Sequence, residues 1–167
     1  MKKIGIFYGS TTGTTKDIAG RIASTLGVDE KDVHNVAETA PSAVGDYDVL
    51  ILGASTWGAG DMQEDMDTFL DGLSMIDLRG KEVAIFGCGS DQMSDTFCNS
   101  VGEIYHRLHR THPEFIGPFN NDGYEYSHSE SDVEGMIVGL CIDEDNHPDL
   151  TDRRIKEWCE EIKKEFC

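Results

Sequence analysis

Hydroxyl side chains are concentrated between the first apolar run, Ile4–Tyr8, and the first helical pattern. The residues of this segment are Ser10, Thr11, Thr12, Gly13, Thr14 and Thr15. Hydroxyls and backbone N–H groups at a helix N-terminus can hold a phosphate, and a glycine allows close approach. A Thr-rich helix cap explains the segment equally well. Nucleotide hydrolysis and ordinary NAD binding are disfavoured, because the segment lacks the lysine of a Walker motif and the three spaced glycines of a dinucleotide fingerprint.

Two other segments of small and polar residues follow apolar runs. One follows residues 49–53 and contains Ser55, Thr56, Trp57, Gly58, Ala59 and Gly60; the other follows residues 83–87 and contains Cys88, Gly89, Ser90, Asp91 and Met93. A single aromatic residue such as Trp57 more commonly closes a core, but the neighbouring glycines leave space beside its ring. With Met93 as a second wall, the segments suggest a slot for a planar ring. A phosphate site beside such a slot predicts a pocket for a mononucleotide-like cofactor.

The elements that must position these segments alternate along the chain. Strands are expected at residues 4–8, 33–36, 49–53 and 83–87, and a last strand in two parts at 115–117 and 136–142, interrupted by an insertion at 118–135. Apolar residues at helical spacing predict helices around Ile22, Val101 and Trp158, the last with Thr151 as its N-cap. This alternation predicts an α/β fold of three layers with a parallel sheet. Ligands of such sheets bind beyond the carboxyl ends of the strands, where the three segments would meet.

Length and charge limit the classes of function. The 167 residues fit one domain, and 32 acidic against 14 basic residues give a net charge of −18. Nucleic acid and anionic membranes are disfavoured as partners, because both are bound mainly through Lys and Arg. A protein with a basic docking face would instead be attracted.

The cysteine pattern and the hydropathy indicate a cytoplasmic protein. The number of cysteines is odd, and no two of them form a C-x-x-C pair, which favours reduced thiols over disulfides or a zinc site. The cysteines are Cys88, Cys98, Cys141, Cys159 and Cys167. No run approaches the roughly 20 apolar residues that span a bilayer. The sequence thus predicts neither a membrane anchor nor a disulfide framework.

The chain resembles a flavodoxin of the long-chain type over essentially its whole length. Four motifs carry the resemblance, namely Ile4–Thr15, the Thr56–Trp57 loop ending in Gly60–Gln63, Phe86–Gly89 with Phe97–Cys98 behind it, and Gly139–Asn146 followed by Pro148–Thr151. The insertion at 118–135 matches that of the long-chain type. The resemblance implies a single flavodoxin-like domain over residues 1–167, with a doubly wound, five-stranded parallel sheet in the order 2-1-3-4-5.

The resemblance also implies a noncovalently bound FMN. Its phosphate would lie on residues 10–15, Trp57 would pack on one face of the isoalloxazine, and the Gly58–Ala59 peptide would lie near flavin N5. The other residues named in the second and third segments, Asp91 included, are expected to contact the cofactor as well. The family usually places a tyrosine on the outer flavin face, and Met93 occupies that place here. Methionine offers less stacking area, so weaker packing and changed potentials are expected.

The function implied by the resemblance is electron transfer rather than enzymatic catalysis. A low-potential one-electron carrier would shuttle FMN between semiquinone and hydroquinone. Its partners would be redox proteins with basic docking faces, such as a flavodoxin/ferredoxin reductase or a pyruvate:flavodoxin oxidoreductase, and it would act as a monomer. An FMN-dependent NAD(P)H:quinone reductase on the same fold is the alternative. A phosphate-switched signalling module is excluded, because Phe7-Tyr8-Gly9 ends the first strand where acidic residues would be required.

Several lesser signals leave alternatives open. One group of acidic residues is expected either to surround the flavin or to form a solvated face. The group consists of Asp61, Glu64, Asp65, Asp67, Asp71, Asp91 and Asp95. An apolar docking spot could form from Met62, Met66 and Met93. Tyr124 and Tyr126 could contact a partner or pack the insertion down. The repeat of His106, His109 and His112 is better explained by cations at a helix C-terminus than by a metal site.

Overall fold

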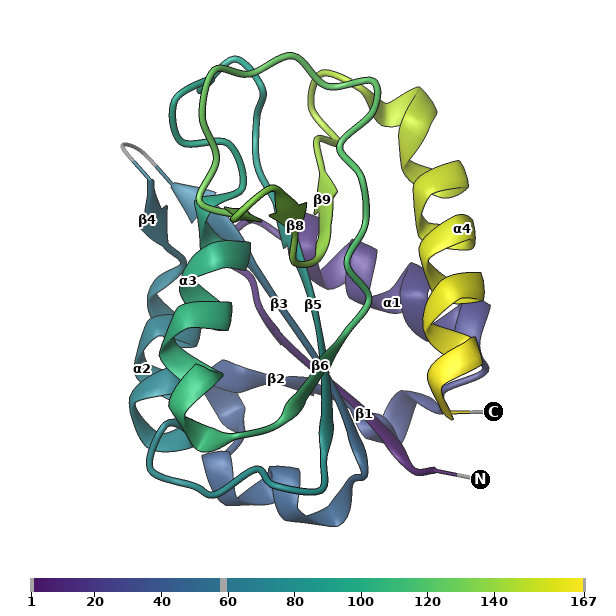
Figure 1. Cartoon of the computed structure of the whole chain (residues 1–167). Coiled ribbons are helices and arrows are strands. Elements are labelled where there is room, and N and C mark those ends of the chain that lie inside the picture. Colours follow the sequence, from purple (N-terminus) through teal and green to yellow (C-terminus); the bar gives the residue numbers. More distant parts are fainter. Residues whose placement is uncertain (1, 58–59, 167) are drawn as a thin grey trace.

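A parallel sheet with helices on both faces forms the body of the protein (Figure 1). The computed structural model describes residues 2–57 and 60–166. Its main strands are β1 (Ile4–Gly9), β2 (Val33–Asn35), β3 (Val49–Trp57), β5 (Glu82–Cys88), β6 (Glu114–Ile116) and β9 (Leu140–Ile142). They are parallel and ordered β2-β1-β3-β5-β6, with β9 also pairing with β5. This order confirms the predicted flavodoxin-like, doubly wound topology.

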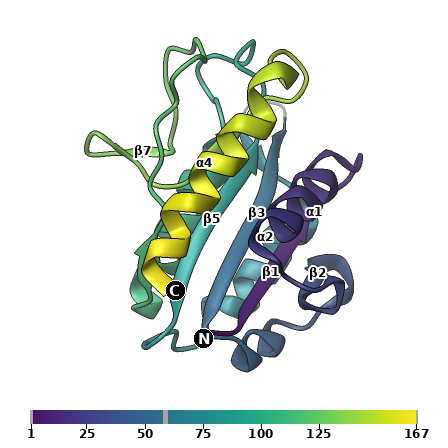
Figure 2. The same cartoon turned by 90° about the vertical axis from the view of Figure 1, so that its right-hand side faces the viewer.

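The helices form the two outer layers. They are α1 (Thr14–Leu26), α2 (Glu64–Leu73), α3 (Asn99–Leu108) and α4 (Pro148–Phe166), with short 3-10 turns at Glu30–Asp32, Val36–Glu38, Pro41–Asp46 and His109–Thr111. Helices α1 and α4 lie together on one face of the sheet (Figure 2), and α2 and α3 cover the other. Strands β3 and β5 are buried on both faces, which explains why their sequences are continuously apolar.

The last strand is split, as the sequence predicts. Strand β6 pairs with the first half of β5 and β9 with the second half, so that Ile116 lies beside Ala84 and Leu140 beside Phe86. The prediction that the second part begins at Met136 is wrong. Met136 lies instead in a separate antiparallel hairpin, β7 (Asp132–Val133) with β8 (Met136–Ile137). Residues 134 and 135 both have positive φ and turn the chain back at this point.

Arg154 of α4 holds the segment between β6 and β9 against the domain. Its buried guanidinium donates to the carbonyl oxygens of Asn120 (2.7 Å), Cys141 (3.2 Å) and Asp122 (3.5 Å). It also lies 4.6 Å from the ring centroid of Tyr124. The tyrosines of the insertion are packed inward: Tyr124 is buried, and the ring of Tyr126 stacks on Phe97 at 4.9 Å. Of the two alternatives for these tyrosines, the structure favours packing.

Helix α4 begins earlier than its sequence suggests. Thr151 was expected as the N-cap, but the helix starts at Pro148 and Thr151 is fully buried inside it. Proline suits the first turn of a helix, because its φ is helical and it lacks the N–H that would have no partner there. None of the helices in residues 2–57 and 60–166 combines the length and the apolarity needed to cross a lipid bilayer.

Candidate functional site: a cavity at the carboxyl edge of the sheet

A cavity of about 280 Å³ opens where β1, β3 and β5 end. Most of its lining residues come from the three segments singled out in the sequence. The described lining residues are Ser10, Thr12, Thr14, Thr15, Ser55, Thr56, Trp57, Cys88, Gly89, Ser90, Met93, Thr96, Glu144 and Asp145. Thr11, Gly13, Gly60 and Asp91 belong to the same segments without lining the cavity, and Gly58 and Ala59 lie outside the described residues.

The first segment leaves the N-terminus of α1 uncapped. Gly13 is the N-cap residue with φ +98°, and no described side chain forms a capping hydrogen bond there. Ser10 instead accepts a hydrogen bond at Oγ from the Gly13 N–H (3.1 Å). The Thr-rich cap that the sequence allowed is therefore not what forms. The N–H groups of the first turn stay available to an anion, and the helix dipole favours negative charge there.

A buried glutamine connects this segment to α2 (Glu64–Leu73). Gln63 is 1% exposed, and its Nε2 donates to Thr11 Oγ1 (3.2 Å), while its Oε1 accepts from the Met66 N–H (2.9 Å) and caps α2. A Cβ atom on residue 9 would collide with this side chain, which explains Gly9 at the end of β1. The glutamine thus fixes the hydroxyl-rich segment relative to α2.

Trp57 forms a wall of the cavity and does not close the core. It ends β3, pairs with Asp61 of the short antiparallel strand β4 (Asp61–Met62), and remains 41% exposed. The preceding Thr56 accepts a hydrogen bond at Oγ1 from the Ser100 N–H of α3 (2.9 Å). The indole is consequently carried by a strand end that is fixed on both sides.

The third segment supplies a neutral and partly apolar wall. Burial raises the pKa of the Cys88 thiol to about 12, so this residue contributes no charge at neutral pH. Met93 lines the cavity and is 46% exposed. Asp91 is placed differently, because its carboxylate is only 4% exposed and is bonded to Glu125 and His147.

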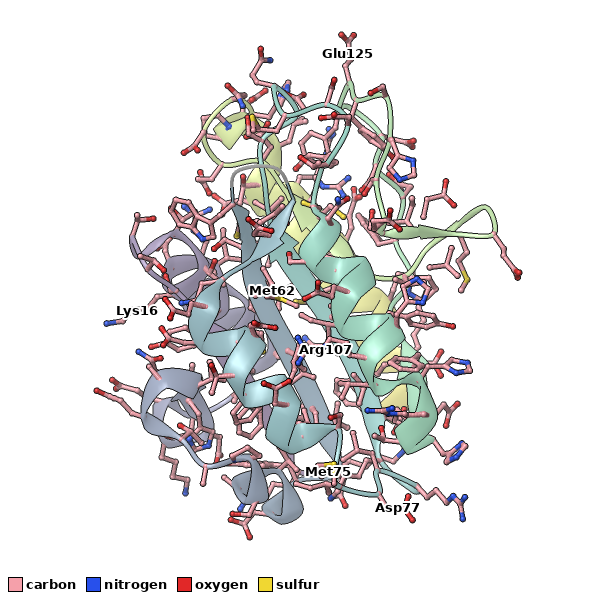
Figure 3. All side chains as sticks on the ribbon, turned by 90° about the vertical axis from the view of Figure 1, so that its left-hand side faces the viewer. Lys16, Met62, Met75, Asp77, Arg107 and Glu125 are labelled. Atoms are coloured by element: carbon pink, nitrogen blue, oxygen red, sulfur yellow. The ribbon has the colours of Figure 1, made fainter. Side chains whose placement is uncertain are left out.

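The carboxylates at the cavity are not the ones expected. None of the seven acidic residues named from the sequence is among the described lining residues, whereas Glu144 and Asp145 are. Asp67 and Asp71 of α2 pair with Arg107 of α3, which lies between the two helices (Figure 3). Glu144 is itself paired with Arg21 at 3.1 Å. The predicted methionine spot is also wrong in part, because Met66 is fully buried on the inner face of α2.

Thr96, Glu144 and Asp145 line the cavity and were missed as site residues. The two acids follow β9, so the rule that ligands bind beyond strand ends would have found them had it been applied to the last strand. Both stand in the tail motif that carried part of the resemblance. Thr96 gives no such signal, because it lies several residues past the end of β5.

A parallel sheet that is wound in both directions, with a polar cavity at the edge where its order reverses, places the chain among the doubly wound α/β proteins, whose ligand sites lie at this edge. The sequence matches the family model described as Flavodoxin over residues 6–158. It is 38% identical to a flavodoxin of Haemophilus influenzae, with 100% of this chain and 97% of the relative covered, and 39% identical to flavodoxin 1 of Escherichia coli K12, with 99% and 96% covered. The chain belongs to the flavodoxin family.

A solved structure of the family superimposes on the whole chain. The crystal structure of Fusobacterium nucleatum flavodoxin bound to flavin mononucleotide matches with a TM-score of 0.92 and 33% identity, covering 100% of both chains. Flavodoxins are electron-transfer proteins rather than enzymes, which confirms that prediction from the sequence.

Proposed function

We propose that the chain is a low-potential one-electron carrier that holds FMN noncovalently in the cavity at the carboxyl edge of the sheet. Family membership and the FMN-bound flavodoxin of Fusobacterium nucleatum support this proposal. The observation that carries it is the combination of the uncapped N-terminus of α1 with the half-exposed Trp57 around one cavity. These are the two surfaces that a phosphate and an aromatic ring require.

The hydroxyl-rich segment would bind the phosphate without a basic side chain. Ser10, Thr12, Thr14 and Thr15 all line the cavity, and no Lys or Arg is among the described lining residues. A phosphate carries about −1.5 to −2 charges at neutral pH and accepts several hydrogen bonds. Hydroxyls, free N–H groups and the dipole of α1 can supply the donors and the positive potential that it needs.

Trp57 and Met93 would hold the ring system between them. An indole provides a large flat surface, and the thioether of Met93 is polarisable and can lie against an aromatic face or edge. The Gly58–Ala59 peptide, which lies outside the described residues, is proposed near N5 of the ring. When bound, FMN supplies two successive one-electron steps, and the protein's role is to bind, orient and electrostatically tune it.

The charge of the protein would make the reduced cofactor a strong donor. Adding an electron adds negative charge, and Asp145 at the cavity and a net charge of −18 oppose that addition. The same field would attract partners with basic docking faces, such as a flavodoxin/ferredoxin reductase or a pyruvate:flavodoxin oxidoreductase. We propose that the protein acts on them as a cytoplasmic monomer.

Titration of the apoprotein with FMN and with riboflavin tests the site. FMN is expected to bind far more tightly than riboflavin, which lacks the phosphate but has the same ring, and quenching of flavin fluorescence measures both dissociation constants. A redox titration followed by absorbance should then resolve two separate one-electron steps. Failure to bind FMN, or equal affinity for the two flavins, would falsify the phosphate site.

Mixing the FMN-loaded protein with NADPH in a stopped-flow instrument separates the carrier from the quinone reductase. A carrier is reduced slowly by NADPH alone, because it has no nicotinamide pocket. Rapid reduction together with turnover of a quinone would overturn the assignment as a carrier while leaving FMN binding intact.

A further inference from the structure

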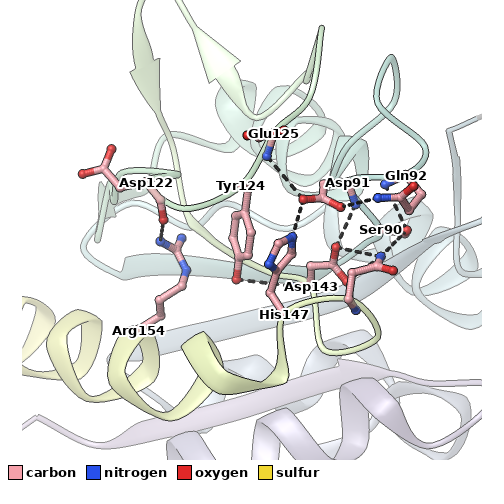
Figure 4. Close-up of polar contacts among 10 residues, drawn as sticks. Ser90, Asp91, Gln92, Asp122, Tyr124, Glu125, Asp143, His147 and Arg154 are labelled. Carbon is pink, nitrogen blue, oxygen red and sulfur yellow. Dashed lines mark hydrogen bonds and ion pairs between the residues drawn. The ribbon is translucent and has the colours of Figure 1, made fainter.

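A polar network built around two buried carboxylates lies behind the third segment of the cavity (Figure 4). We call it the Asp91 network; its members are Asp91, Asp143, Asn146 and His147. Asp91 is 4% exposed and Asp143 is fully buried. Two carboxylates in a buried position are costly unless their oxygens are hydrogen-bonded. The partners of these oxygens therefore indicate what the network stabilises.

The bonds of Asp143 join the third segment to the start of α4. Its Oδ2 accepts from the Asp91 N–H (2.9 Å), and its Oδ1 accepts from the Asn146 N–H (2.9 Å). Asn146 in turn donates from Nδ2 to Ser90 Oγ (2.8 Å). The oxygens of Asp143 are thus used within the protein, and the cluster of Asp91, Asp143 and His147 is a hydrogen-bond network rather than an open metal cage.

The bonds of Asp91 add the insertion to this assembly. Its Oδ2 accepts from the Glu125 N–H (3.3 Å) and lies 2.5 Å from His147 Nε2. Burial acts to raise the pKa of Asp91, but the hydrogen bonds from Glu125, His147 and Gln92 outweigh it and hold the pKa below its ordinary value. Asp91 is consequently a carboxylate, which can only accept, so His147 Nε2 is the donor.

The Asp91 network reaches the cavity at two places, the third segment and the residues that precede α4. Ser90 and Met93 of the third segment line the cavity, and so do Glu144 and Asp145, which lie between Asp143 and Asn146. We propose that His147 is a positioning residue of the cofactor site: by donating to Asp91 from the start of α4, it fixes the wall that carries Ser90 and Met93. This inference rests on the proposed function for the identity of the ligand.

Three substitutions of His147 test the proposal in the full-length protein. His147→Gln keeps an amide nitrogen near the place of Nε2, whereas His147→Asn is one methylene too short to reach Asp91. Asn is also favoured just before the first turn of a helix, so it should not weaken the start of α4. His147→Ala removes the donor altogether.

Two measurements are made on each variant. In the apoprotein, amide hydrogen exchange over residues 90–96 and 124–128 should become about tenfold faster in His147→Asn and His147→Ala, and should stay within about twofold in His147→Gln. The dissociation constant of FMN should rise about tenfold in the same two variants and be restored in His147→Gln. The exposed His106 of α3 lies outside both exchange windows and provides the control, so His106→Ala should change neither measurement.

The outcomes separate this proposal from the proposed function. Equal exchange and equal FMN affinity in His147→Gln and His147→Asn would overturn the positioning role, whether or not His147→Ala folds. Loss of protection in His147→Asn with unchanged FMN affinity would also overturn it, because the network would then be only structural. Absence of FMN binding by the unsubstituted protein would refute the proposed function, while the exchange data on the apoprotein would still report on the network.

Discussion

The two polar walls of the cavity are built in opposite ways. The segment at residues 10–15 is shaped locally, by the positive φ of Gly13 and the contact of Ser10 with its N–H, and it leaves backbone donors free. The segment at residues 88–93 is held by Asp91, whose partners lie 34, 52 and 56 residues away and satisfy its polar groups. In the proposed complex, the phosphate would therefore be held by donors that the protein leaves unpaired, whereas the ring would be held by side chains that are fixed from behind.

Placing a negative charge on the segment at residues 10–15 should have the largest effect on FMN affinity. Thr14→Glu adds a carboxylate at the first position of α1, beside the proposed phosphate. At about 5 Å and an effective dielectric constant of 20, the repulsion is about 3 kcal/mol for each unit of phosphate charge, so FMN affinity should fall by at least about a hundredfold. Riboflavin affinity should change little, and the apoprotein should become more stable by about 0.3–1 kcal/mol, because an acid near a helix N-terminus is favourable.

The controls for Thr14→Glu are Thr14→Gln, which has the same shape without the charge, and Thr14→Ser, which keeps the hydroxyl. Fluorescence titration gives the affinities, and urea unfolding of the apoprotein gives the stability. Unchanged FMN affinity in Thr14→Glu would show that the phosphate binds elsewhere.

Removing the indole of Trp57 should weaken the binding of FMN and of riboflavin equally. Trp57→Ala deletes a half-exposed aromatic wall, and the loss of its contact area should cost about 2 kcal/mol, or about thirtyfold in affinity. Because the phosphate site is untouched, the ratio of riboflavin to FMN dissociation constants should stay that of the unsubstituted protein. Trp57→Phe should recover part of the loss. A variant that alters this ratio would contradict the separation of the two walls.

Substituting Met93 by tyrosine should strengthen the contact between the segment at residues 88–93 and the flavin ring. An aromatic pair contributes about 0.5–1.5 kcal/mol beyond its buried area, so Met93→Tyr should tighten FMN binding by about three- to tenfold. The potentials of the two redox steps should shift as well. Met93→Leu, which keeps the size and removes the sulfur, is the control. Finding that neither the affinity nor either potential changes in Met93→Tyr would exclude this residue from the flavin face.

Neutralising a carboxylate at the cavity should have the smallest effect. At about 10 Å and an effective dielectric constant near 40, one charge alters the energy of the reduced flavin by about 0.8 kcal/mol, or about 35 mV. Asp145→Asn should therefore raise the potential of the more negative step by about that amount. Asp77, at the end of the molecule opposite Glu125 (Figure 3), is the control, and Asp77→Asn should leave the potential unchanged. Equal shifts in both variants would mean that only the net charge matters.

The sequence predicts those features that depend on neighbouring residues. The continuous apolar runs of β3 and β5 predict buried parallel strands, and the hydroxyl-rich segment predicts one wall of the cavity. The Asp91 network was not predicted, because its partners are brought together only by the folded chain. The burial of Met66 could have been predicted, because Met66, Phe69, Leu70 and Leu73 have the spacing of the inner face of α2. Met136 was assigned to the wrong strand because the turn at residues 134 and 135 places it in a separate hairpin.

Arg154 has a consequence for shortening this protein. Its guanidinium is buried and bonds to carbonyl oxygens at Asn120 and Asp122, which belong to the insertion. Excising the insertion would remove two of its three carbonyl acceptors and the rings of Phe119 and Tyr124 that pack on it, leaving the guanidinium to the Cys141 carbonyl and to water. The surface of α4 and β9 that the insertion covers would be opened in the same step, so a minimal version of this fold needs that surface redesigned together with the deletion.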